Sequence, residues 1–92
     1  MGDQTTTQKH KNFVAGPIGD KAANTLPGIG PVAGQNLQLA GFGRAKYIMG
    51  QHLVNSDPEV FADWMKNNAG INRGNAMKTR KCLSQWCDNF MD

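Results

Sequence analysis

Apolar side chains recur at every third or fourth position along most of this chain, which is the spacing of helices that bury one face. No segment alternates between apolar and polar residues as a half-buried strand does. The pattern predicts a first helix that begins near Gln8 and is ended by Gly16-Pro17, because a proline disfavours helical geometry in the residue before it. Four further helices are expected at 31–40, 44–54, 58–70 and 75–90, and a short helical segment is expected at 22–26.

These segments predict an all-α fold, namely a compact five-helix single domain over residues 8–92. A polar segment at residues 1–7 precedes it and is expected to be flexible, because it lacks apolar anchors. A chain of 92 residues suffices for one domain and no more. So small a domain leaves apolar surface that the association of two copies would bury.

One face of each predicted helix is assigned to the core by the same periodicity. The residues expected to face inward are Phe13 and Val14 in the first helix; Val32, Ala33, Asn36, Leu37 and Ala40; Ala45, Ile48, Met49, His52 and Leu53; Val60, Phe61, Trp64 and Met65; and Thr79, Leu83, Trp86, Cys87 and Phe90.

Two alternative signals mark the start of the helix at 58–70. Asp57 could cap it, with Pro58 at the first helical position, or Ser56 and Glu59 could form a capping box. Residues 71–74 are expected to form the turn before the last helix.

The main functional signal is the stretch Leu-Pro-Gly-Ile-Gly-Pro at 26–31, followed by an amphipathic helix. A helix N-terminus presents unpaired N–H groups and a partial positive charge, so it binds anions. A glycine just before it has no Cβ and lets a phosphate approach the main chain. We therefore expect a helix-hairpin-helix at about 22–40, of the kind found in DNA repair proteins and polymerases.

In this hairpin, Ile29 is expected to reach into the core and fix the turn. The donors to a phosphate would be the main-chain N–H groups of Gly28, Gly30, Val32 and Ala33. Such contacts hold a duplex without reading its bases. A plain connector between two helices is the alternative, since glycine and proline are common in connectors.

The formal net charge of +3 and the pI of about 9.1 are compatible with an anionic partner. Basic side chains on the first and last helices could support DNA binding or could simply be solvated helix faces. These side chains are Lys9, Lys11, Lys78, Arg80 and Lys81.

The two cysteines, Cys82 and Cys87, lie about 140° apart around a helix. They are therefore expected as free thiols. Their spacing is not that of a metal site, so we expect neither a metal nor another cofactor. The polar N-terminus and the lack of a long apolar run predict neither secretion nor insertion into a membrane.

Several blocks from about Thr5 to Met91 resemble the barrier-to-autointegration factor family in order and at nearly constant spacing. They are Thr-Thr-Thr-Gln-Lys-His-Lys-Asn-Phe-Val-Ala at 5–15, Pro-Ile-Gly-Asp-Lys at 17–21, Gly-Ile-Gly at 28–30, Gly-Phe at 41–42, Gly-Gln at 50–51, Trp64, Cys-Leu-Ser-Gln-Trp-Cys-Asp at 82–88 and Phe90.

The resemblance implies a helical homodimer in which each subunit offers one hairpin, so that one dimer bridges two DNA duplexes without sequence preference. It also implies chromatin compaction, nuclear-envelope assembly and the binding of LEM-domain proteins of the inner nuclear membrane. The implied localisation is the nucleus, at chromatin and the nuclear envelope, and also the cytoplasm.

Carried over by position, the resemblance implies three groups of site residues. The DNA contacts are Gln8, Lys9, Gly28, Ile29, Gly30, Val32, Ala33, Asn72 and Arg73. The surface for the second subunit and the LEM domain includes Phe42, Gly50, Leu53, Val54, Val60 and Trp64. The positions phosphorylated to release DNA are Thr5, Thr6 and Thr7, where each phosphate would add about −1.5 to −2 charges.

Some positions depart from the family pattern and predict a divergent member. Asn-Ser-Asp-Pro at 55–58 replaces a longer loop with a lysine pair, which weakens the expected LEM-domain contact. Met77 stands where an arginine near DNA is usual. His52 stands at an aromatic position, and Lys46 stands where tyrosine is common.

Two other functions compete with DNA bridging. A glycosylase of the helix-hairpin-helix type would need a catalytic aspartate, such as Asp57 or Asp63, and a base-sized pocket between two helical lobes. Ninety-two residues cannot build both lobes, and His10 and His52 have no neighbouring partners for a triad, so we expect no enzyme. The other alternative is a helical protein–protein adaptor that has lost DNA binding.

Overall fold

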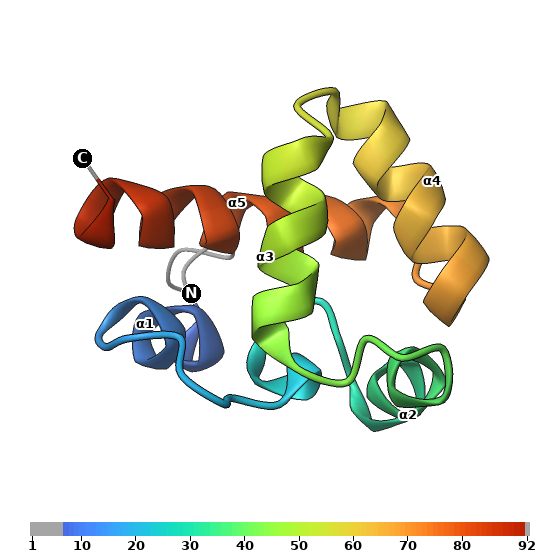
Figure 1. The fold of residues 1–92 in the computed structure, drawn as a ribbon, viewed down its shortest axis with the longest axis horizontal. Helices are drawn as coiled ribbons and strands as arrows, with labels where there is room; N and C mark the ends of the chain where they lie inside the picture. Colours follow the sequence, from blue (N-terminus) through green and yellow to red (C-terminus); the bar gives the residue numbers. More distant parts are fainter. Residues whose placement is uncertain (1–6, 92) are drawn as a thin grey trace.

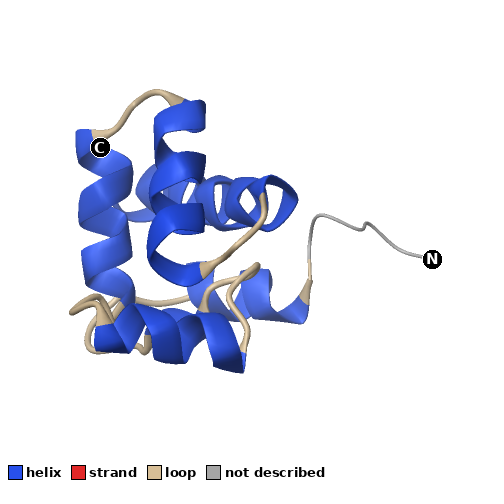
Figure 2. Cartoon of the chain, turned by 90° about the vertical axis from the view of Figure 1, so that its right-hand side faces the viewer, coloured by secondary structure: helices blue, strands red, loops and turns tan. Residues whose placement is uncertain are grey.

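The structure is a computed structural model that describes residues 7–91. Within this part of the chain there are five α-helices and one 3-10 turn, and no residue belongs to a strand (Figure 2). The elements are α1 (Gln8–Val14), η1 (Ala23–Thr25), α2 (Pro31–Leu39), α3 (Ala45–Val54), α4 (Pro58–Ala69) and α5 (Arg73–Phe90). The predicted all-α, five-helix fold is confirmed, although the segment at 22–26 forms a single 3-10 turn.

Helix α5 is the longest element, at 18 residues, and it organises the domain (Figure 1). It packs against α1, α3 and α4, and α3 crosses over it in the view of Figure 1. Helix α2 packs against η1 and α4. The radius of gyration of 12.0 Å agrees with the value of about 12 Å that scaling gives for a compact chain of this length.

Polar side chains cap three of the helices at their N-termini. Thr7 accepts a hydrogen bond from the main-chain N–H of His10 (3.1 Å) at the start of α1. Asp57 accepts one from the N–H of Glu59 (2.9 Å) at the start of α4, so the first of the two predicted capping signals is the one used. At α5 the capping residue is Asn72.

The cap on α5 changes one predicted boundary. The Asn72 side chain accepts a hydrogen bond from the N–H of Asn75 (2.8 Å), so the helix begins at Arg73. The predicted turn at 71–74 was therefore two residues too long at its C-terminal end. Gly70 closes α4 with a φ of +69°, a left-handed conformation that glycine adopts without strain.

The buried core gathers apolar side chains from every helix and from the turn before α2. The buried apolar residues are Phe13, Ala23, Leu26, Ile29, Leu37, Ala45, Ile48, Met49, Phe61, Ala62, Met65, Ala69, Ile71, Ala76, Cys82 and Leu83. The turn thus contributes to the core directly, which fixes its position relative to the helices.

The predicted inward face of α2 was too wide. Of its five residues, Leu37 is buried, whereas Val32 is 73% exposed and Ala40 is also exposed. Helix α2 packs mainly against η1 and α4, so a narrow stripe of its surface is covered. Leu53, Val60 and Phe90 were also predicted to face inward and are exposed. Each lies near one end of its helix, where no other described element covers the predicted stripe.

Candidate nucleic-acid interface

The predicted hairpin lies between η1 and α2 and leaves the N-terminus of α2 open to solvent. Leu26, Pro27 and Ile29 are buried, so the turn is anchored from beneath. The expectation that Ile29 reaches into the core is confirmed, because only 1% of it is exposed. The outer side of the turn is formed by the main chain and by two glycines.

Four main-chain N–H groups in this turn have no hydrogen-bond acceptor within residues 7–91, and they are the predicted donors of Gly28, Gly30, Val32 and Ala33. The first N–H of α2 that is paired belongs to Gly34, which donates to the carbonyl of Gly30 (2.8 Å). Unpaired donors at a helix N-terminus, together with the helix dipole, attract an anion.

The same four residues line a shallow hollow of about 310 Å³. The opposite wall is formed by the turn between α4 and α5, from Ala69 to Asn72, and by Asn75. The structure therefore brings the predicted hairpin and the predicted contact residue Asn72 to one hollow, although 40 residues separate Asn72 from Val32 in the chain. That contact with DNA itself stays a prediction.

The two glycines of the turn have different roles, and only at Gly30 does the missing side chain leave open space. Gly28 has a φ of +88°, and a Cβ there would lie 2.2 Å from the carbonyl oxygen of Asn75. The lack of a side chain at Gly28 makes room for the main chain of helix α5 and not for a phosphate. Gly30 has an ordinary extended conformation (φ −89°), and nothing lies within 4 Å of a Cβ placed on it. Gly30 is thus the glycine that keeps the hollow open.

A buried threonine holds the turn against α5. The Thr79 hydroxyl lies 2.6 Å from the Pro27 carbonyl oxygen and 3.1 Å from that of Asn75. Sequence reasoning placed Thr79 on the inner side of the last helix but gave it no role at the site. A lone polar residue in an apolar stripe is the signal that could have identified it.

Lys9 is the basic residue that reaches the hairpin directly. Its Nζ donates a hydrogen bond to the carbonyl oxygen of Ile29 (2.8 Å), and partial burial lowers the pKa of this lysine. Gln8, its predicted companion, instead donates to the side chain of Asn12 (2.8 Å) on the exposed surface of α1. Of the two, Lys9 alone contacts the turn.

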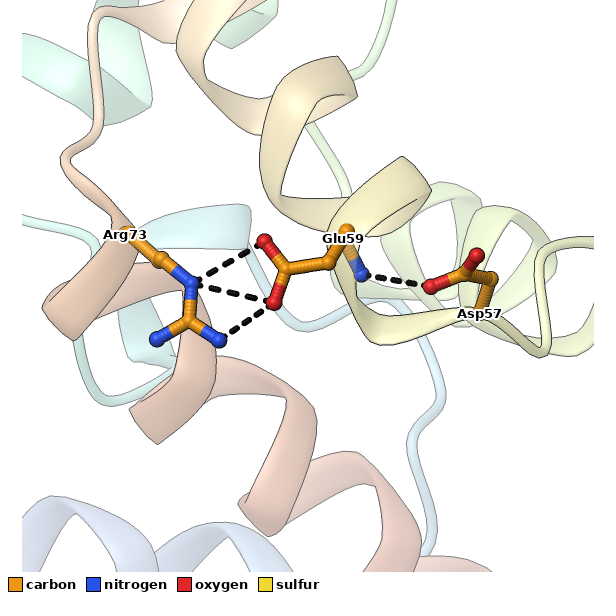
Figure 3. Close-up of polar contacts among 3 residues, drawn as sticks. All are labelled: Asp57, Glu59 and Arg73. Carbon is orange, nitrogen blue, oxygen red and sulfur yellow. Dashed lines mark hydrogen bonds and ion pairs between the residues drawn. The ribbon is translucent and has the colours of Figure 1, made fainter.

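Arg73 makes a contact that the sequence did not predict. Its guanidinium group forms an ion pair with the carboxylate of Glu59 in the first turn of α4, with Nε 3.0 and 3.1 Å from the two oxygens (Figure 3). The hydrogen bond from Arg73 lowers the pKa of Glu59 and raises that of the arginine. Arg73 does not line the hollow.

A second candidate surface lies on α3 and the start of α4. Phe42 and Trp64 are half-buried against each other in an edge-to-face contact (4.9 Å between ring centroids). Leu53, Val54 and Val60 are exposed, and Val54 is 79% exposed. Apolar side chains in such a position are available for another chain.

Tyr47 belongs to this surface and was missed. It is exposed, and it precedes Gly50 and Val54 by three and seven residues, so all three share one face of α3. Helical spacing alone could have found it. We refer below to Tyr47, Gly50, Leu53, Val54 and Val60 as the α3 surface.

Thr5 and Thr6 lie outside the described residues, and Thr7 is the cap of α1. Cys82 and Cys87 are free thiols on α5, and burial raises the pKa of Cys82 to about 12. Among residues 7–91, no cluster of three or more acidic, histidine or cysteine side chains could hold a metal. No described helix has both the length and the apolar character to span a membrane.

Comparison with known proteins adds an independent observation. A family model described as barrier to autointegration factor matches residues 4–90. The barrier-to-autointegration factors of Danio rerio and Homo sapiens are 43% and 42% identical to this chain over 88 residues, covering 95% of it and 98% and 99% of those proteins. That of Drosophila melanogaster is 44% identical over 87 residues, 94% of this chain and 97% of its own.

Proposed function

This chain belongs to the barrier-to-autointegration factor family, and on that basis we propose that it binds double-stranded DNA without sequence preference and bridges two duplexes as a homodimer. The observation that carries the proposal is the set of unpaired N–H groups around the hollow at the start of α2. They offer hydrogen bonds to phosphate oxygens, which carry no sequence information. The expected ligand is therefore the backbone of any duplex.

The charge around the hollow supports a phosphate ligand. The positive end of the α2 dipole faces the hollow. The ammonium group of Lys9 adds a positive charge to the turn itself, because it donates a hydrogen bond to the carbonyl of Ile29, between Gly28 and Gly30. Gly30 adds no side chain that would exclude a phosphate. These features suit an anion that approaches the main chain closely.

Bridging requires two copies of the hairpin in one particle. We propose that the α3 surface forms the subunit contact, because it exposes four large apolar side chains on a domain that is too small to cover them itself. Phe42 and Trp64 would line the adjoining surface for LEM-domain proteins. Roles in chromatin compaction and nuclear-envelope assembly, residence in the nucleus and the cytoplasm, and the absence of catalysis belong to the same proposal.

One measurement tests DNA binding and bridging together. The mass of the free protein, and of its complex with a short duplex, is determined by light scattering. We expect a dimer that takes up two duplexes, and equal affinity for two unrelated duplexes of one length. The logarithm of the binding constant should fall linearly with the logarithm of salt concentration, with a slope of about −0.9 per phosphate contacted. A monomer, or a strong preference for one sequence, would contradict the proposal.

A protein–protein adaptor without DNA binding is the second candidate. It is favoured by the composition of α2, which carries no charged side chain, and by the pairing of Arg73 with Glu59. Among residues 7–91, Lys9 is then the one lysine or arginine whose side chain forms a hydrogen bond with the turn at 26–31. A protein that retards no duplex in a gel at low salt, yet forms a dimer, would be this adaptor.

A further inference from the structure

The ion pair between Glu59 and Arg73 connects the first turns of α4 and α5 beside the hollow. Arg73 directs its guanidinium group at both carboxylate oxygens of Glu59 (Figure 3). Both side chains remain largely in solvent, with 64% of the arginine and 59% of the glutamate exposed. An ion pair this exposed contributes little to the stability of a fold.

Helix formation does not explain the pair either. Asp57 already caps α4 and Asn72 already caps α5, so neither helix depends on it. Arg73 is the first residue of α5, where the helix dipole disfavours a cation. An arginine at this position is therefore held against the local electrostatic preference of its own helix.

The position of Arg73 matters for the hollow. Its neighbour Asn72 lines the hollow together with Gly30 and Val32, and so does Asn75. Arg73 therefore follows directly, in the chain, a residue that lines the proposed phosphate site. In the free protein that charge is neutralised by Glu59, and the arginine is directed to α4 instead.

We infer that Glu59 competes with a DNA phosphate for Arg73. Glu59 binds the arginine in the free protein and releases it to a phosphate oxygen when a duplex occupies the hollow. The guanidinium group presents a planar pair of N–H donors that fits a carboxylate and a phosphate equally well. A duplex must displace Glu59 from Arg73 to gain this contact. The glutamate therefore lowers the affinity for DNA below the value that the same protein would have without this carboxylate. The inference rests on the proposed DNA binding.

The test compares wild type with four variants of the full chain and measures the affinity of each for one duplex over a range of salt concentrations. Glu59→Gln removes the competing charge and should raise the affinity about fivefold to tenfold near 0.1 M salt, with a slope steeper by up to about 0.9. Asp63→Asn is the matched control, because Asp63 is an exposed acid on the same helix without a basic partner in the described chain. It should change the affinity far less.

A third and a fourth variant separate a specific competitor from a general charge effect. These two proteins are the Arg73→Gln variant and the double variant Arg73→Gln/Glu59→Gln. If Glu59 acts through Arg73, the double variant should bind DNA no more tightly relative to Arg73→Gln than Asp63→Asn does relative to wild type. A gain that persists without the arginine would overturn the inference, because the glutamate would then act by long-range charge alone.

The remaining outcomes distinguish the inference from the proposed function. If wild type binds DNA and loses binding on Gly30→Glu, while Glu59→Gln changes neither affinity nor slope, the inference is wrong and DNA binding stands. If wild type binds no duplex at low salt, both are wrong. Both Glu59 and Arg73 lie at the surface, so circular dichroism of each variant should match that of wild type.

Discussion

The hydroxyl of Thr79 lies 2.6 Å from the carbonyl oxygen of Pro27, in the interior of the domain. The contact joins residues 52 positions apart and attaches the hairpin turn to the middle of α5. The hairpin is therefore positioned by the last helix of the chain, although its own sequence determines its local shape. The proposed DNA site depends on this attachment.

Replacing Thr79 should show how much the attachment stabilises the fold. Thr79→Val keeps the shape but leaves the buried Pro27 carbonyl without a donor, which should lower the free energy of unfolding by about 1–3 kcal/mol. Thr79→Ser keeps the hydroxyl, so its free energy of unfolding should fall clearly less. Urea denaturation of the two variants checks this, and equal losses would show that the hydrogen bond is not the stabilising feature.

Alanine should be costly at one glycine of the turn and tolerated at the other. Gly28→Ala places a Cβ against the Asn75 carbonyl at positive φ, and should cost about 2 kcal/mol of stability or more. Gly30→Ala meets open space in an extended conformation and should change stability little. Thermal unfolding of both proteins compares them directly. A tolerated alanine at position 28 would contradict the packing described here.

A charge at Gly30 tests the phosphate site without disturbing the fold. Gly30→Glu places a carboxylate at the mouth of the hollow and should weaken DNA binding about tenfold or more by repelling the phosphate. Gln38→Glu is the control, because it adds the same charge at the other end of α2. Similar losses in the two variants, measured by fluorescence anisotropy, would mean that the hollow is not the site.

The pH dependence of stability should contain a contribution from His52. Burial, and then the charge of Arg80, lower the pKa of His52 below 6.5. The unfolded chain therefore binds a proton more readily than the folded one. Stability from this group is complete above the unfolded pKa, and it declines as the pH falls through about 6.5 towards the lower folded pKa.

His52→Phe should remove that contribution. A phenyl ring can keep the edge-to-face contact with Phe61 and cannot be protonated. Between pH 7 and pH 5 the variant should lose less stability than wild type, as measured by urea denaturation at each pH. Because His10 is present in both proteins, its effect cancels in the comparison. Parallel curves would show that His52 does not titrate in this range.

The α3 surface can be tested with one charge. Val54→Glu places a carboxylate among the exposed apolar side chains and should convert a dimer into a monomer of about 10.0 kDa by light scattering. Leu39→Glu is the control, because Leu39 is equally exposed but lies on α2. A dimer that survives Val54→Glu and dissociates on Leu39→Glu would place the subunit contact on α2 instead.

Local signals in the sequence determined a large part of this structure. The helical spacing, the Asp57-Pro58 start and the glycine that ends α4 identify helices with short-range preferences, and the observed bounds follow them within a few residues. The unpaired donors at the start of α2 follow from the same local rules, since every helix leaves its first N–H groups unpaired. The hairpin could therefore be recognised before its surroundings were known.

The tertiary structure alone decided what surrounds the hairpin. That Gly28 makes room for Asn75, that Thr79 holds Pro27, and that Arg73 is bound by Glu59 all depend on how α4 and α5 pack against a turn far away in the chain. A sequence carries the spacing along one element, but the contact between two elements depends on their relative placement. The packing of the whole core sets that placement.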